Sequence, residues 1–183
     1  MQNPKKHLFF ALSVLFASHS WAQGGKTVRV NQQRIEQRIS ALAEFGRNPQ
    51  GGVSRVGFSE ADKQGRAYVI GLMKQAGLAI TIDAVGNIIG RREGRRADAP
   101  AILFGSHIDS VPEGGNYDGP VGSIGAIECA QVLFENEIVT EHPLEVIIFS
   151  NEEGGLVGSR GFVGTLSDEA LEVVTSSGLT IRD

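Results

Sequence analysis

AILFGSHIDSVPEGGNYDGPVGSIGAIECAQVLFENEIVTEHPLEVIIFSNEE, residues Ala101–Glu153, holds the elements from which the rest of the architecture can be worked out. It contains two apolar runs, Ala101–Gly105 and Leu144–Ser150, which are too short for helices and rich in residues that favour buried strands. We expect both strands at the centre of a sheet. Between them, Gly119–Asn136 repeats apolar side chains at helical spacing, which predicts a parallel strand-helix-strand unit with a right-handed crossover.

Polar side chains follow both predicted strands. His107 and Asp109 come after the first strand, and Glu152 and Glu153 come after the second. A further carboxylate, Asp118, lies in a glycine-rich turn where the crossover helix would begin. Because ligands bind outside the carboxyl ends of parallel strands, we expect these side chains to converge.

One imidazole among several carboxylates is typical of a metal site. Crowded acids raise one another's pKa unless a cation neutralises them, and a divalent metal can also bind the imidazole. Oxygen and imidazole ligands without a thiolate suit zinc, cobalt, nickel or manganese. Asp109 could accept the other ring N–H of His107 and so orient the ring. If Glu153 binds the metal, its neighbour Glu152 is left as a general base.

The segments GSHIDSVPEGGNYDG (105–119) and FSNEEGGLVGSRGF (149–162), with AVGNIIGRR (84–92) before them, resemble a family of metal-dependent amidohydrolases. The family includes N-carbamoyl-L-amino-acid hydrolase, allantoate amidohydrolase and ureidoglycolate hydrolase, and it is related to aminoacylase and the zinc carboxypeptidase of bacteria. The resemblance implies an α/β fold with a mixed, mainly parallel sheet flanked by helices, of the zinc-exopeptidase type. It also implies a cis peptide bond at Asp118-Gly119.

The resemblance further assigns a role to each site residue. It implies that His107 binds one metal, Asp118 bridges two metals and Glu153 binds the other. Glu152 would be the catalytic base, and Asp109 would orient His107. The implied cofactors are two divalent ions per subunit, Zn2+ or else Mn2+, Co2+ or Ni2+.

The family completes this site with two further histidines, but no histidine follows His142 here. We therefore interpret residues 23–183 as the amino-terminal part of a truncated catalytic domain, without the family's dimerisation and lid domain and without its C-terminal part. The expected activity is hydrolysis of a linear C–N amide bond in a small N-carbamoyl-amino-acid or ureido (allantoate-like) substrate, and the full-length form should be a homodimer. The alternatives are a metallopeptidase or aminoacylase of the same fold, a non-catalytic binding domain, or an inactive truncation.

Residues 1–22 are typical of a signal peptide. Lys5 and Lys6 form a basic start, Leu8–Ala17 is an apolar core, and small residues precede a cleavage site at Gln23. The core is shorter than the roughly 20 residues that span a bilayer. These features predict a periplasmic or secreted protein with no stable membrane anchor after cleavage. An N-terminal anchor that is never cleaved is the alternative.

The remaining sequence predicts ordinary supporting elements. The formal net charge of -4 gives no basic face for nucleic acid. The single cysteine, Cys129, excludes an intrachain disulfide and is expected to be a small core residue. Helices are expected at Gln32–Phe45, with its apolar stripe against the sheet, and from Ser59 to about Gln75. Residues 78–91 predict a β-hairpin.

Overall fold

The computed structural model describes residues 27–175 and 177–183, so the predicted signal peptide lies outside the described residues. The helices within them are α1 (Gln32–Leu42), α2 (Glu60–Gln75), α3 (Pro120–Glu135), α4 (Val157–Phe162) and α5 (Asp168–Leu171). The strands are β1 (Ala79–Ile82), β2 (Ile88–Arg92), β3 (Ile102–His107) and β4 (Leu144–Phe149). The predicted hairpin and the predicted strand-helix-strand unit are both present.

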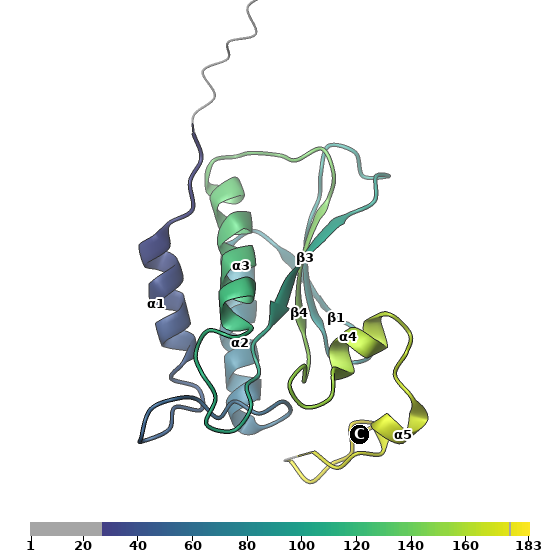
Figure 1. Ribbon diagram of the computed structural model, residues 1–183. Coiled ribbons are helices and arrows are strands. Elements are labelled where there is room, and N and C mark those ends of the chain that lie inside the picture. The colour runs from purple at the N-terminus through teal and green to yellow at the C-terminus, as the bar shows by residue number, and fades with distance from the viewer. Residues whose placement is uncertain (1–26, 176) are drawn as a thin grey trace, which may run out of the picture.

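The four strands form one sheet (Figure 1), and their order is β1-β2-β4-β3. β3 and β4 are parallel and are joined by α3, whereas β1 pairs with β2 and β2 pairs with β4 in antiparallel fashion. The mixed α/β class is therefore confirmed. The expected predominance of parallel pairing is wrong for these strands. The β1-β2 hairpin joins β4 on the side opposite β3, and both of its pairings are antiparallel.

β3 is an edge strand, which corrects the expectation that both strands of the crossover unit are central. In the described residues its only neighbour is β4. Ile102 and Leu103 at the start of β3 are 51% and 37% exposed, whereas Val146 and Ile148 of β4 are fully buried. The two runs are similarly apolar in sequence, but apolar content does not specify which strand receives neighbours on both sides.

The three long helices gather on one side of the sheet (Figure 1). Ser59 caps α2, because its hydroxyl accepts a hydrogen bond from the backbone N–H of Asp62. α2 and α3 cover the sheet. The core between these layers includes Val69, Met73, Ile124, Ile127 and Val146.

α1 packs against α3 and α2 and makes its main contacts with these helices. The expectation that the apolar stripe of α1 faces the sheet is therefore wrong. α3 already covers the sheet, so α1 forms an outer layer, with Ile39 and Leu42 buried against the other helices. This arrangement places the end of α1 near the loop that leads to α2.

Cys129 is exposed, contrary to the expectation of a core position. Ile127 is buried in the core, and Glu128 is buried beneath basic side chains of α1. Cys129, the next residue of α3, lies outside both of these contacts. Within residues 27–175 and 177–183, none of the helices combines the length and apolar character needed to cross a bilayer.

Candidate metal centre

The parallel pairing of β3 with β4 builds one side of the site. His107 is the last residue of β3 and lies opposite Phe149, the last residue of β4. The carboxyl ends of these strands therefore meet, and the acidic pair Glu152 and Glu153 follows β4 by only a few residues. Asp118 approaches from the loop before α3. The three segments converge as the sequence predicts.

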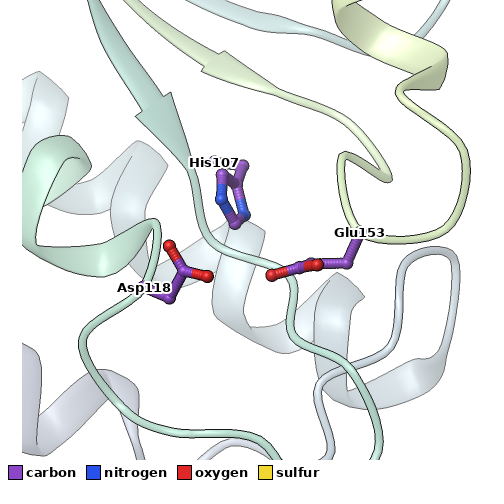
Figure 2. A group of neighbouring side chains, drawn as sticks. All are labelled: His107, Asp118 and Glu153. Atoms are coloured by element: carbon purple, nitrogen blue, oxygen red, sulfur yellow. The ribbon is translucent and has the colours of Figure 1, made fainter.

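His107, Asp118 and Glu153 form a compact cluster of possible metal ligands. One ligand atom from each side chain lies within 4.8 Å of the others. Figure 2 shows the carboxylates of Asp118 and Glu153 pointing toward one another beside the His107 ring. Both carboxylates are exposed, whereas the imidazole is half-buried. One nitrogen and two oxygen ligands with access to solvent fit a divalent ion such as zinc.

Asp109 connects His107 with the turn that contains Glu152 and Glu153. It is 1% exposed, and its Oδ2 accepts a 2.9 Å hydrogen bond from the backbone N–H of Glu153. The Nδ1 atom of His107 lies 3.1 Å from the backbone oxygen of Asp109 and 3.5 Å from its Oδ1. A proton on Nδ1 would therefore point to Asp109 and leave Nε2 available as a ligand.

Burial and hydrogen bonding act in opposite directions on Asp109. Burial raises its pKa, but the His107 ring and the backbone amides of Glu153 and Glu152 outweigh burial and hold the pKa of Asp109 below its usual value. The pKa of His107 is raised, chiefly by Asp109, although burial opposes this effect. Protons therefore compete with a metal for the imidazole, while Asp109 keeps its negative charge.

Glu152 lies outside the three-residue cluster and is held separately. Its Oε2 accepts a 2.9 Å hydrogen bond from the hydroxyl of Ser159 on α4. No role for Ser159 follows from the sequence pattern alone. A serine that follows the predicted base within the same short segment is the signal that could have indicated this contact. Glu152 and Glu153 are thus directed to different partners although they are adjacent in sequence.

Gly119 brings the Asp118 loop close to the histidine. A Cβ atom at position 119 would lie 2.6 Å from Cε1 and Nδ1 of His107, so the backbone packs directly on the ring. The peptide bonds of the described chain are trans, so the expectation of a cis bond at Asp118-Gly119 is wrong. A positive φ of 79° at Gly119 turns the chain into α3 and keeps Asp118 in the cluster.

Comparisons with known proteins show which sequences and folds this chain is similar to. Residues 87–176 match the model of Peptidase family M28. The chain is 42% identical over 159 residues to an N-carbamoyl-L-amino acid amidohydrolase of Geobacillus stearothermophilus, covering 84% of this chain and 39% of that protein. It is therefore similar in sequence and fold to proteins named as carbamoylase-type amidohydrolases. The resemblance found in the sequence is therefore confirmed.

Two further relatives extend the comparison. A ureidoglycolate hydrolase of Oryza sativa subsp. japonica is 38% identical, with 87% of this chain and 34% of that protein aligned. The solved structure of a hydantoinase/carbamoylase family amidase from Burkholderia ambifaria matches with a TM-score of 0.80 at 36% identity, covering 84% of this chain and 39% of that chain. The chain thus spans about two fifths or less of the length of these relatives.

Proposed function

We propose that the complete protein is a metal-dependent hydrolase that cleaves a linear C–N amide bond in N-carbamoyl-amino-acid or ureido substrates. The observation that carries this proposal is the cluster of His107, Asp118 and Glu153, with ligand atoms within 4.8 Å of one another. The relatives named for carbamoyl and ureido substrates support this choice of bond.

In this proposal the cluster would hold two divalent ions: His107 would serve as a ligand for one, Glu153 for the other, and Asp118 for both. The remaining ligands would come from outside this cluster. When bound, such ions polarise a carbonyl oxygen and lower the pKa of water. The donor set of the cluster suits zinc, and also manganese, cobalt or nickel.

Glu152 is the proposed general base. Its carboxylate would take a proton from the attacking water as the water oxygen bonds to the substrate carbonyl carbon. The same proton would then pass to the nitrogen as the C–N bond breaks, so that the amine leaves in neutral form. The hydrogen bond from Ser159 to Oε2 leaves Oε1 for this proton transfer and limits rotation of the carboxylate.

Asp109 acts through other residues in this proposal. Its carboxylate lies beside Nδ1 of His107 and accepts the backbone N–H of Glu153. It therefore orients a ligand from each of two strand ends at once. Because its pKa is held low, the carboxylate stays ionised and favours the tautomer of His107 that presents Nε2.

Paired substitutions in the full-length protein test these roles. Glu152→Gln should keep the bound metal and lower turnover by about 100-fold or more, because it removes general base catalysis. His107→Ala should lose metal and turnover together. Glu141→Gln, an exposed position outside the site, serves as control and should change neither quantity. Elemental analysis and steady-state kinetics give both measurements; equal metal loss in both site variants would make Glu152 a ligand and contradict the proposal.

A metallopeptidase or aminoacylase is the second candidate, because the Peptidase family M28 model matches residues 87–176. The same cluster could serve peptide or acyl-amide hydrolysis. Turnover of N-carbamoyl amino acids, allantoate, dipeptides and N-acetyl amino acids separates the two candidates. Preference for dipeptides or N-acetyl amino acids would favour the second.

The cellular context is part of the proposal. Residues 1–22 would direct export and be cleaved before Gln23, placing the protein in the periplasm or outside the cell. The complete protein would act as a homodimer. N-terminal sequencing of exported protein should begin at Gln23, and sedimentation should give twice the monomer mass; an uncleaved chain or a monomer would contradict the respective statement.

A further inference from the structure

Arg55, in the loop between α1 and α2, is almost completely buried, at 1% exposed. Its Nε donates a 2.7 Å hydrogen bond to the backbone oxygen of Ile108. Its Nη1 donates to the backbone oxygens of Leu42, at 2.8 Å, and Phe45, at 3.0 Å. The guanidinium therefore joins the end of α1 to the segment that leaves β3.

The backbone of Arg55 also forms hydrogen bonds to the segment that leaves β3. Its N–H donates to the hydroxyl of Ser110, and its backbone oxygen accepts from the N–H of Ser110, both at 2.9 Å. The hydroxyl of Ser110 in turn donates to the backbone oxygen of Val53. Arg55 thus holds the chain at Ile108 and at Ser110, on both sides of Asp109.

α2 contains a glycine where the stem of Arg55 passes. A Cβ atom at Gly65 would lie 2.7 Å from Cδ of Arg55, and Gly65 is buried in the interior of the helix. A glycine inside a helix costs about 1 kcal/mol relative to alanine. By contrast, a Cβ atom at Gly71 of the same helix would meet nothing within 4 Å. The tight contact at Gly65 is therefore with the stem of Arg55, while Cδ1 of Ile108 would lie at an ordinary 3.5 Å.

The charges around Arg55 favour the same arrangement. Burial lowers the pKa of Arg55, and the nearby carboxylates of Asp62 and Asp109 oppose this shift. The hydrogen bonds of the guanidinium go to neutral carbonyl groups. A buried charge that is bonded in this way holds backbone groups in place while it also faces the ionised Asp109.

We propose that Arg55 is a positioning residue for the metal centre. By fixing Ile108 and Ser110 it fixes Asp109, and Asp109 sets the backbone of Glu153 and the ring of His107. The metal-binding part of this statement rests on the proposed function. The part that concerns the backbone of Glu153 can be measured without metal.

The first experiment uses the metal-free 183-residue chain and hydrogen exchange of the Glu153 amide, which is bonded to Oδ2 of Asp109. Arg55→Met keeps the apolar stem but removes every side-chain donor, and Arg55→Lys keeps the charge without the planar fork. We expect the Glu153 amide to lose protection in Arg55→Met and to lose part of it in Arg55→Lys. If Arg55→Met does not fold, Arg55→Lys alone decides the result.

A pair of glycine variants gives an independent measurement on α2. Gly65→Ala should displace the stem of Arg55 and reduce protection of the Glu153 amide, although residue 65 itself has no place in the metal cluster. Gly71→Ala adds the same methyl group to the same helix and should leave that protection unchanged. Unchanged protection in Arg55→Lys and Gly65→Ala, with both variants folded, would overturn the proposal.

The second experiment measures Co2+ affinity and the visible absorption spectrum of the bound ion. The Arg55 variants should bind Co2+ about 10- to 100-fold more weakly, as is typical when support of metal ligands is lost, and their spectra should change. Arg38→Met is the matched control, because Arg38 is also buried but bonds Glu128 and Gln131 of α3. It should leave both readings unchanged. These measurements use the full-length protein, because the remaining metal ligands lie outside the cluster. Absence of Co2+ binding by the unsubstituted full-length protein would count against the metal site, whereas equal effects of Arg38→Met and Arg55→Met would overturn the role of Arg55.

Discussion

Gly119 of the Asp118 loop packs directly against the ring of His107 at the end of β3. The ring leaves no room for a side chain at residue 119, and the backbone there has a φ of 79°. An added methyl group would therefore move the ring or the loop. Either movement separates two of the three possible ligands.

We expect Gly119→Ala to weaken Zn2+ binding to the 183-residue chain by about tenfold or more, as for other changes that misplace a metal ligand. Gly51→Ala controls for backbone strain, because Gly51 also has a positive φ of 94° but a Cβ atom there would meet nothing within 4 Å. Calorimetric titration measures both affinities. Equal affinities in the two variants would show that the contact with the ring has no influence on binding.

The sequence was sufficient to select the three candidate metal ligands and Asp109 beside His107, but not the further supporting contacts of Arg55 and Ser159. His107, Asp118 and Glu153 could be found because each follows a strand or precedes the crossover helix. Arg55 could not, because its hydrogen bond to Ile108 spans 53 residues and depends on how two loops pack. The contact from Ser159 to Glu152 likewise depends on the orientation of a short helix.

At the scale of elements, α1 is held against α3 by ion pairs to a buried carboxylate. Glu128 of α3 is fully buried and pairs with Arg34 and Arg38 of α1. It also accepts the backbone N–H of Asn31, which precedes the helix. These contacts explain why α1 lies on α3 although its apolar stripe resembles one that would face a sheet.

Glu128→Ala should lower the free energy of unfolding by about 3 to 5 kcal/mol, because it leaves two arginines without their buried partner. Glu145→Ala is the comparison, since Glu145 pairs with Arg91 at a partly exposed position. Its loss should cost about 1 kcal/mol or less. Urea denaturation measures both values. Similar losses in the two variants would mean that burial of Glu128 adds nothing to the attachment of α1.

Local sequence signals predicted most helices and strands, whereas the order of the strands in the sheet could be determined only from the folded structure. Ser59 and Gly119 mark the starts of α2 and α3, and the apolar runs mark β3 and β4. Pairing partners have no comparable local signal, because an apolar strand satisfies the same pattern at an edge or at the centre. The position of β3 and the antiparallel contact of β2 with β4 were therefore missed.

At the scale of the whole molecule, we expect the side of β3 that has no strand partner among the described residues to affect behaviour in solution. An edge strand with exposed apolar side chains can pair with another chain. Leu103→Lys should reduce concentration-dependent association of the 183-residue chain. Val139→Lys introduces the same charge at a similarly exposed loop position and serves as control. Sedimentation velocity under reducing conditions measures association; equal reduction by both variants would point to net charge instead of the edge.

The exposed Cys129 offers a practical advantage for all of these measurements. It is the one cysteine in the sequence, and it lies on α3, the helix that follows the Asp118 loop. A maleimide fluorophore or nitroxide can therefore be attached at a single known point without any substitution. A paramagnetic label there would broaden nearby nuclear resonances according to distance and so report whether α3 shifts when an ion is added.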